Sequence, residues 1–346
     1  MTSNNAIIFS KAPTDFPVVG EHLKFEKREF KLPEPGKDEV VTENIYVSID
    51  PYQRGRMRNP KIKSYSPPFP LNEPIRNAGV ARVYKSNNSK FAKGDLVYVQ
   101  GCEWSEYTLF TAQETQAMNK INNQHNIPLS NFVGAVGMPG MTAYSSFYEI
   151  GKPQKGETIF ISAASGAVGQ IVGQLAKREG LRVVGSAGTD DKVKHLKELN
   201  FDEAFNYKTE KPSEALSKYC PDGVDIYFEN VGGETLDAVL DAANNHARFI
   251  MCGMISQYNT ADKYGVKNLM QIVAKRLTLQ GFIVSDPNFW PKYQNDFYTN
   301  VPKWLASGEI KYREDIADGL EAGADKFVGM LKGENFGKTM IRIRPE

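Results

Sequence analysis

The stretch ETIFISAASGAVGQIVGQLAKREGLRVVGSA, residues 157–187, decides the fold class of this 346-residue chain. Its first eight residues (157–164) have the apolar character of a buried strand, and AVGQIVGQLAKREG (167–180) has the pattern of a helix that Gly180 ends. LRVVGSA (181–187) is typical of a second strand. This strand, helix and strand predict a parallel βαβ unit.

The same alternation continues after this unit. A helix is expected over 190–199, where Val193, Leu196 and Leu199 form one apolar stripe. Apolar segments that predict further strands lie at 203–207, 224–230, 247–253 and 277–284. Strands that alternate with helices indicate a doubly wound parallel sheet of the Rossmann type, so we predict an α/β domain over residues 132–311.

The amino-terminal third of the chain has a different rhythm. Short apolar runs such as 39–49 and 95–101 are separated by Pro, Gly and Asn, which indicates a β-rich domain of barrel or sandwich type. Near the carboxyl terminus the pattern becomes irregular and ends in an apolar strand, 338–345. We therefore expect residues 1–131 and 312–346 to form one domain together.

The turn between the first strand and the helix carries a ligand-binding pattern. Ala164, Gly166 and Gly169 follow the spacing of the dinucleotide fingerprint, with alanine in place of the first glycine. Gly166 lets the backbone approach a pyrophosphate, Gly169 allows close helix packing, and the helix amino terminus offers N–H groups to phosphates. A tight turn of small residues without a ligand is the alternative explanation.

The tip of the second strand bears on the choice of dinucleotide. Enzymes that use NAD place an acid about twenty residues after the fingerprint, whereas this tip reads Val184-Gly185-Ser186. Asp190 and Asp191 come slightly later and also suit a helix start. Lys192, with Tyr207 after the third strand, is suited to the 2'-phosphate of NADPH, although a helix lysine is usually solvated. The residues by themselves favour NADPH only modestly.

Composition excludes several other classes of function. The 42 basic and 41 acidic residues give a net charge of +1, which argues against a nucleic acid partner. No apolar run is long enough for a membrane span, and a secretory signal is not evident, so a cytoplasmic location is expected. The histidines and cysteines show no zinc-ligand spacing, so we expect no metal; these residues are His22, His125, His195, His246, Cys102, Cys220 and Cys252.

Blocks along nearly the whole chain resemble a known family. The blocks are VSIDPYQRGRM (47–57), GMPGMTAYSSFYEI (137–150), AASGAVG (163–169), VVGSAGTDDKV (183–193), FNYK (205–208), FENVGG (228–233), CGMISQYN (252–259), GFIV (281–284) and GENFGK (333–338). Together they are similar to the zinc-independent medium-chain dehydrogenase/reductases, within the alkenal and prostaglandin reductase branch. The resemblance implies a GroES-like first domain, a Rossmann second domain and a homodimer.

The resemblance also implies an NADPH site and a substrate site. Lys192 and Tyr207 look like the ligands of the 2'-phosphate, which makes NADPH the expected cofactor. Tyr258 resembles a tyrosine that assists enolate protonation, and Tyr52 resembles one that faces the substrate. The further expected cofactor-binding residues are Thr142, Gly166, Ala167, Val168, Gly169, Gly188, Asn230, Cys252, Gly253, Ser256, Phe282, Ile283, Val284 and Asn335.

Two positions depart from the family pattern. The segment Arg76-Asn77-Ala78-Gly79-Val80 stands where many relatives have a more glycine-rich loop, and Gln53 stands where methionine is common. Both departures are expected to affect the substrate pocket rather than cofactor binding.

The resemblance favours one reaction and leaves others open. We expect NADPH-dependent reduction of the C=C bond of α,β-unsaturated aldehydes or ketones, in which hydride reaches the β-carbon and the enolate is then protonated. Tyr258 follows a strand end at the ligand-binding edge of the sheet, which supports its role, whereas Tyr52 is equally consistent with a packed turn aromatic. A carbonyl reductase, a quinone reductase and a non-catalytic NADPH-binding protein remain alternatives.

Overall fold

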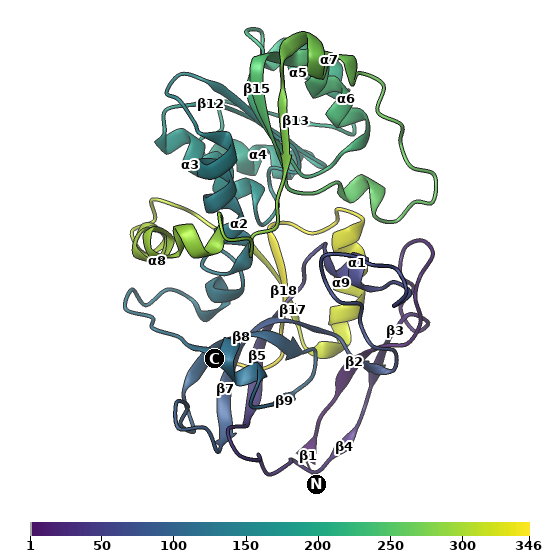
Figure 1. Ribbon diagram of the computed structural model, residues 1–346, viewed down its shortest axis with the longest axis vertical. Helices are drawn as coiled ribbons and strands as arrows, with labels where there is room; N and C mark the ends of the chain where they lie inside the picture. The colour runs from purple at the N-terminus through teal and green to yellow at the C-terminus, as the bar shows by residue number, and fades with distance from the viewer. Residues whose placement is uncertain (1) are drawn as a thin grey trace. The chain divides into compact units, whose positions relative to one another are not determined.

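The computed structural model describes residues 2–346, so Met1, with which the predicted first domain begins, lies outside the described residues. The chain forms two compact units. The first contains the residues up to Gly137 together with Glu314–Glu346, and the second contains Met138–Arg313 (Figure 1).

The second unit is built on a parallel sheet with the strand order β13-β12-β11-β14-β15-β16. The strands are β11 (Thr158–Ile161), β12 (Arg182–Ala187), β13 (Glu203–Asn206), β14 (Val224–Glu229), β15 (Ala243–Met251) and β16 (Thr278–Gly281). The strand order reverses between β11 and β14, because β11 pairs in parallel with both β12 and β14. This reversal is the point at which doubly wound sheets bind ligands.

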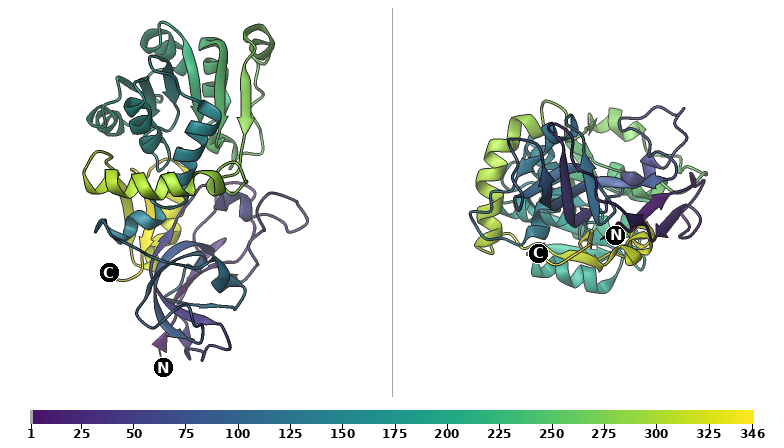
Figure 2. Two further views of the ribbon diagram at one scale, coloured as in Figure 1. Left: turned by 60° about the vertical axis from the view of Figure 1, so that its left-hand side comes forward. Right: turned by 90° about the horizontal axis from the view of Figure 1, so that it is seen from below.

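Helices lie on both faces of this sheet (Figure 2). The helices of this unit are α2 (Met138–Ser146), α3 (Gly169–Arg178), α4 (Asp190–Glu198), α5 (Pro212–Tyr219), α6 (Gly233–Ala242), α7 (Met270–Lys275) and α8 (Trp290–Ala306), with shorter helices η3 (Phe147–Gly151) and η4 (Ile255–Gln257). The sheet core is aromatic: Phe160 and Tyr227 are fully buried, with ring centroids 5.5 Å apart. Burial on both faces explains why the strands read as continuous apolar runs.

The first unit is β-rich. Its main sheet joins β10 (Asn119–Lys120), β8 (Leu96–Glu103), β7 (Arg76–Ser86), β5 (Val40–Ser48), β18 (Lys338–Arg342) and β17 (Glu314–Asp318), while β9 (Tyr107–Phe110) also pairs with β5. Smaller elements complete it: β1 (Thr2–Ser3), β2 (Ala6–Phe9), β3 (Leu23–Glu26), β4 (Glu29–Phe30), β6 (Glu73–Pro74), α1 (Gln53–Arg56), α9 (Gly323–Leu331), η1 (Glu114–Ala117), η2 (Leu129–Val133) and η5 (Leu320–Ala322). The carboxyl-terminal strand β18 pairs antiparallel with β5, so the tail lies in this sheet.

The predicted fold class, a doubly wound parallel sheet plus a β-rich domain, is confirmed. Some predicted strands are too long. The strand expected over 277–284 ends at Gly281 because the backbone N–H of Ile283 donates to the carboxylate of Asp286, 3.1 Å away, rather than to a neighbouring strand. Likewise, the strand expected over 338–345 ends at Arg342.

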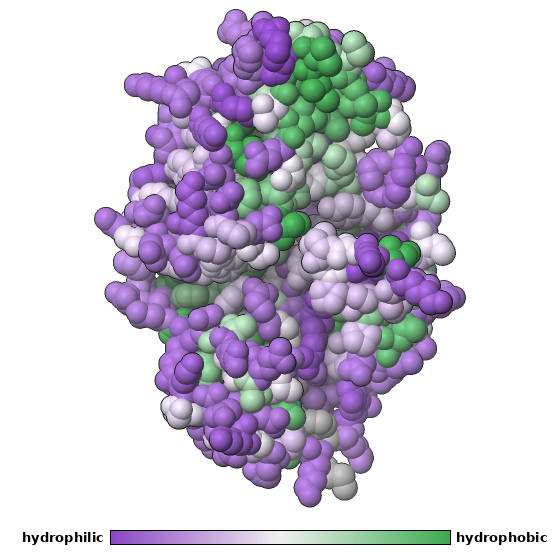
Figure 3. Space-filling view, viewed as in Figure 1, coloured by the Kyte–Doolittle hydropathy of each residue, from purple (hydrophilic) through white to green (hydrophobic). Residues whose placement is uncertain are grey.

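The surface of the second unit carries an apolar patch where α7 lies (Figure 3). Leu269, Met270 and Val273 are 52%, 75% and 69% exposed, which is unusual for side chains of this kind. Within residues 2–346, no helix is both long and apolar enough to cross a bilayer.

Candidate functional site

Most of the predicted cofactor residues follow the carboxyl ends of the parallel strands. The turn 162–168 follows β11, Gly188 and Lys192 follow β12, and Tyr207 follows β13. Asn230 follows β14, the segment 252–258 follows β15, and the segment 282–284 follows β16. Because all these strands are parallel, the residues gather at one edge of the sheet, which is where doubly wound sheets bind ligands.

The turn before α3 requires glycine at position 169. A Cβ atom there would lie 2.7 Å from Cα and 2.8 Å from the carbonyl oxygen of Ala164, and these backbone atoms cannot move aside easily. At Gly166 a Cβ atom would meet only the carbonyl of Ala163, at 3.2 Å. Gly169 therefore sets the close approach of helix and strand, and Gly166 keeps the backbone of the turn accessible.

Lys192 is more enclosed than the sequence indicates, whereas Tyr207 is 40% exposed. Lys192 lies in the first turn of α4, after the N-cap Thr189, and is only 6% exposed. Tyr207 covers Gly188 so closely that a Cβ atom on the glycine would lie 3.0 Å from the tyrosine hydroxyl. A buried lysine at the amino end of a helix fits an anionic ligand, because both attract negative charge. Lys192 is therefore not the solvated helix lysine of the alternative explanation.

Sequence reasoning missed the buried carboxylate of Glu229, directly before Asn230. Its Oε1 accepts hydrogen bonds from the hydroxyl of Tyr227 and the backbone N–H of Gly232, at 2.7 and 2.8 Å. Its Oε2 is buried without a partner in the described part of the chain, and burial raises the pKa of this carboxyl. The glutamate in the block FENVGG was the sequence feature that could have pointed to this carboxylate. The hydrogen bonds of the carboxylate hold the turn after β14.

Asn230 itself is fixed by β11. Its amide donates to the carbonyl of Ser162 at 2.7 Å, and its backbone N–H donates to the Ser162 hydroxyl at 2.9 Å. These bonds join the two strands between which the strand order reverses, β11 and β14, so the Asn230 side chain is held at the switch point of the sheet.

The segment after β15 turns back on β14. The backbone N–H groups of Cys252 and Gly253 both donate to the carbonyl of Glu229, at 3.0 Å each, and the Ser256 hydroxyl donates to the carbonyl of Val231. The Tyr258 hydroxyl lies 3.0 Å from where a Cβ atom on Gly253 would be, so position 253 must be small. Burial raises the pKa of the Cys252 thiol to about 12, which makes this cysteine a poor nucleophile.

Three other predicted cofactor positions in this unit have structural partners. The Thr142 hydroxyl donates to the carbonyl of Met138 within α2, at 2.8 Å. Phe282 packs its ring against Phe289, with centroids 4.9 Å apart, and the carbonyl of Val284 accepts from the backbone N–H of Trp290. The ring contact and the backbone hydrogen bond hold the 282–284 segment in place.

Tyr52 and Asn335 belong to the first unit. Tyr52 is half-buried at the start of α1, and its hydroxyl donates to Oδ1 of Asn77 at 2.7 Å. Gln53 is fully buried, and its amide oxygen accepts from the backbone N–H of Asp50. Asn335 donates to the carbonyl of Gly337 at 2.9 Å. The structure thus brings both departures from the family pattern, Gln53 and the segment with Asn77, into one cluster around Asp50 and Tyr52.

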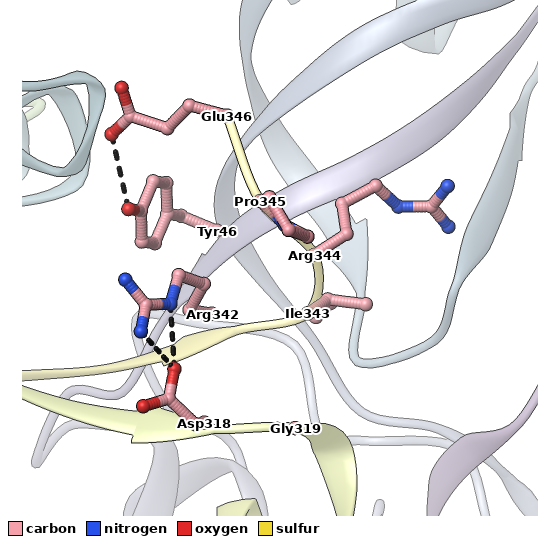
Figure 4. Close-up of a pocket in the computed structure, with 8 residues that line it drawn as sticks. All are labelled: Tyr46, Asp318, Gly319, Arg342, Ile343, Arg344, Pro345 and Glu346. Atoms are coloured by element: carbon pink, nitrogen blue, oxygen red, sulfur yellow. Dashed lines mark hydrogen bonds and ion pairs between the residues drawn. The ribbon is translucent and has the colours of Figure 1, made fainter.

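A separate hollow of 520 Å³ lies at the carboxyl terminus of the first unit (Figure 4). Two contacts lie within its lining: Arg342 binds Asp318 at 2.6 Å, and the Tyr46 hydroxyl donates to Glu346 at 3.1 Å. None of the predicted site residues lines it; the lining residues are Tyr46, Asp318, Gly319 and 342–346. For metal ions, residues 2–346 contain no group of three or more His, Cys, Asp or Glu side chains that is suited to bind one.

Comparisons with known proteins agree with this architecture. Residues 167–301 match the family described as zinc-binding dehydrogenase, and residues 5–118 match the amino-terminal domain of oxidoreductases. The chain is 51% identical, over the full length of both chains, to a zinc-type alcohol dehydrogenase-like protein of Schizosaccharomyces pombe. It is 46% identical to an NADP(+)-dependent 2-alkenal reductase of Nicotiana tabacum, covering 99% of this chain and 98% of that protein. Among solved structures, CurA of Vibrio vulnificus in complex with NADPH superposes with a TM-score of 0.88 at 36% identity, covering 99% of this chain and 100% of the other.

Proposed function

This chain belongs to the alkenal double-bond reductase branch of the medium-chain dehydrogenase/reductase superfamily, and we propose on that premise that it reduces the C=C bond of α,β-unsaturated aldehydes and ketones with NADPH. The observation that carries the cofactor half of the proposal is the buried lysine. Lys192 stands at the start of α4, where a 2'-phosphate would be bound by its ammonium group and by the helix terminus. The ammonium group of a lysine at this position would bind the 2'-phosphate that NADPH carries and NADH lacks, so we infer a preference for NADPH.

The remaining cofactor residues fit the same ligand. The turn with Gly166, Ala167, Val168 and Gly169 opens α3, whose N-cap Val168 makes no side-chain capping bond, so a pyrophosphate can accept from the first N–H groups of the helix. Gly188 and Tyr207 would bound the adenosine end. Asn230 at the switch point and the segments 252–258 and 282–284 would line the ribose and nicotinamide, together with Thr142 and Asn335.

NADPH supplies a hydride, which adds to the β-carbon of the unsaturated carbonyl compound. What remains for the protein is to bind the substrate in line with that transfer, to stabilise negative charge on the carbonyl oxygen and to deliver a proton to the α-carbon. We assign the proton delivery to the Tyr258 hydroxyl, which lies at the carboxyl edge of the sheet, and we place Tyr52 at the substrate. Small residues such as Gly253 leave room for the tyrosine.

The proposal is tested by following NADPH oxidation with a panel of enals, enones, quinones and saturated aldehydes, with NADH in parallel and the enone products identified. Saturated carbonyl products and a strong preference for NADPH are expected. Allylic alcohols would instead make the protein a carbonyl reductase, and a clear preference for quinones would make it a quinone reductase. NADPH binding without oxidation of any compound in the panel would make it a non-catalytic binding protein.

A further inference from the structure

The carboxyl group of Glu229, at the end of β14, is the centre of a buried hydrogen-bond cluster in the second unit. Its Oε1 accepts from the backbone N–H groups of Val231 and Gly232, at 2.6 and 2.8 Å, and from the Tyr227 hydroxyl at 2.7 Å. Glu229 is fully buried. One carboxyl oxygen thus binds donors from both the sheet and the turn, and it holds the turn 230–232 against the end of its own strand.

The two oxygens of this carboxyl have different surroundings. Oε2 is buried and has no hydrogen-bond partner among residues 2–346. Burial raises the pKa of the Glu229 carboxyl above its usual value, although the hydrogen bonds to Oε1 act in the opposite direction. A carboxylic acid with its proton on Oε2 still accepts hydrogen bonds at the other oxygen. The bonds to Oε1 therefore require an acceptor oxygen at this position rather than a negative charge.

The segment 252–258 rests on this turn through backbone hydrogen bonds. The N–H group of Ile255 donates to the carbonyl of Asn230, and the N–H group of Ser256 donates to the carbonyl of Val231, at 3.1 Å each. Both acceptors belong to the backbone of the turn. The position of the turn therefore sets the position of the segment.

Gly232 keeps the turn and the segment in close contact. Its φ is 76°, a conformation that favours glycine, and a Cβ atom there would lie only 3.0 Å from Cβ of Met254. The carbonyl of Glu229 itself accepts from the N–H groups of Cys252 and Gly253. Glu229 therefore holds the segment in two ways, directly through its backbone carbonyl and indirectly through the turn that its side chain binds.

Tyr258 is the last residue of this segment. Its backbone N–H donates to the carbonyl of Ile255 at 3.2 Å, and its hydroxyl lies 3.0 Å from where a Cβ atom on Gly253 would be. Ile255 is bonded to Asn230 and Gly253 is bonded to Glu229. Both residues that locate Tyr258 are thus bound to the end of β14 and the turn after it.

We propose that Glu229 is a positioning residue for the reaction: its Oε1 holds the turn 230–232, and through this turn it fixes the Tyr258 hydroxyl where proton delivery requires it. The inference rests on the proposed function, which assigns proton delivery to Tyr258. A displacement of about 1 Å in a reacting group can cost about a hundredfold in rate, so a residue that only holds the turn has a large effect on turnover. The acceptor oxygen of the side chain matters here, and its charge does not.

The test compares two substitutions of similar size at position 229. Glu229→Gln keeps an acceptor oxygen and cannot carry a charge, whereas Glu229→Leu removes the acceptor. Each is also combined with Tyr258→Phe, and Glu234→Leu, at an exposed glutamate in the first turn of α6, is the matched control. The quantity measured is kcat for 3-penten-2-one at saturating NADPH, so that a change in cofactor affinity does not enter. Thermal unfolding shows which variants are folded.

Glu229→Leu is expected to lower kcat by about tenfold to a hundredfold when Tyr258 is present. In the Tyr258→Phe background the same substitution should lower kcat by less than about threefold, because no hydroxyl is left to position. Glu229→Gln should keep kcat within about threefold of the wild-type value, since its amide oxygen can accept the same hydrogen bonds. The control should keep the wild-type kcat.

Three results would overturn the inference. One is a loss in Glu229→Leu that is equally large without the Tyr258 hydroxyl, which would mean that Glu229 supports the whole edge of the sheet. Another is a loss in Glu229→Gln as large as that in Glu229→Leu, which would mean that the charge is required. The third is a wild-type enzyme that does not oxidise NADPH with the enone, which overturns the proposed function as well and is recognised before any variant is made. If Glu229→Leu does not fold, Glu229→Ala replaces it.

Discussion

Lys192 is the side chain that we propose selects NADPH. It is buried at the start of α4, and replacement by methionine keeps its length while removing its charge. We expect Lys192→Met to raise the Kd for NADPH by about tenfold to a hundredfold, the value of one charge-assisted hydrogen bond, and to leave the Kd for NADH nearly unchanged.

Titration of the fluorescence of each reduced cofactor measures both constants. Lys194→Met, two residues along the same helix at an exposed position, is the control and should bind both cofactors as wild type does. An equal loss of affinity for NADPH and NADH would mean that Lys192 supports the local fold at the start of α4 and does not recognise the 2'-phosphate.

Tyr258 is the residue to which we assign proton delivery. Tyr258→Phe removes the hydroxyl that we assign to proton delivery and keeps the ring, so we expect kcat for an enone to fall by about a hundredfold while the Kd for NADPH stays near the wild-type value. Steady-state kinetics and cofactor titration separate the two effects. Tyr298→Phe, at a half-exposed tyrosine of α8, should change neither quantity. Unchanged turnover in Tyr258→Phe would remove this tyrosine from the mechanism.

At the scale of elements, one carboxylate holds the long segment between η4 and α7 against helix α6. Asp237 on α6 accepts hydrogen bonds from the Tyr264 hydroxyl and from the backbone N–H groups of Lys267 and Asn268, at 2.8 to 3.0 Å. Burial raises the pKa of the Asp237 carboxyl, but these bonds outweigh burial, and the net pKa lies below its usual value. The folded state therefore favours the charged form.

The sign of the pH effect follows from this lowered pKa. Stability from Asp237 is fully present above the pKa of an unfolded aspartate, about 3.9, and is lost as the pH falls through the lower folded value. Asp237→Asn should lower the free energy of unfolding at neutral pH by about 1–3 kcal/mol and weaken the acid dependence. Urea unfolding at a series of pH values measures both, with the exposed Asp262→Asn as control. A variant with the wild-type acid profile would contradict the assignment.

The order of the elements could be predicted because its signals are local. Apolar runs of strand length, helical stripes and the glycines at 166 and 169 lie within short windows, and burial of the sheet on both faces makes its strands apolar throughout. Strand ends were less predictable: β16 ends at Gly281 because Asp286 captures the next backbone N–H.

The buried polar network around Asp50 could not be predicted, because its contacts join residues that are far apart in the sequence. Its partners, Asn77 and Lys338, are 27 and 288 residues away along the chain, and neither lies in a pattern that marks a buried polar group. Lys192 presents the same difficulty, since a lysine in the first turn of a helix gives no sign that it is buried. Glu229 was passed over because a lone acid at a strand end is common.

For the whole molecule, the open edge of the parallel sheet predicts self-association. Among residues 2–346, β16 pairs only with β15, so its outer edge offers unpaired backbone groups next to the exposed Met270 and Val273 of α7. A two-fold axis perpendicular to the sheet at this edge would pair β16 antiparallel with its copy and keep both α7 patches on the same face, where they can cover each other in a closed homodimer. This is the surface on which we place the homodimer that the family resemblance implies.

Val273→Glu tests this placement, because a two-fold interface would bring the new charge near its own copy and bury it. We expect wild type to run as a dimer by size-exclusion chromatography with light scattering, and Val273→Glu to shift to the monomer mass with its thermal unfolding otherwise retained for each unit. Val18→Glu, at a 51% exposed valine of the first unit, should remain dimeric. A dimer that tolerates Val273→Glu would place the interface elsewhere, and a monomeric wild type would show that the patch on α7 has another role.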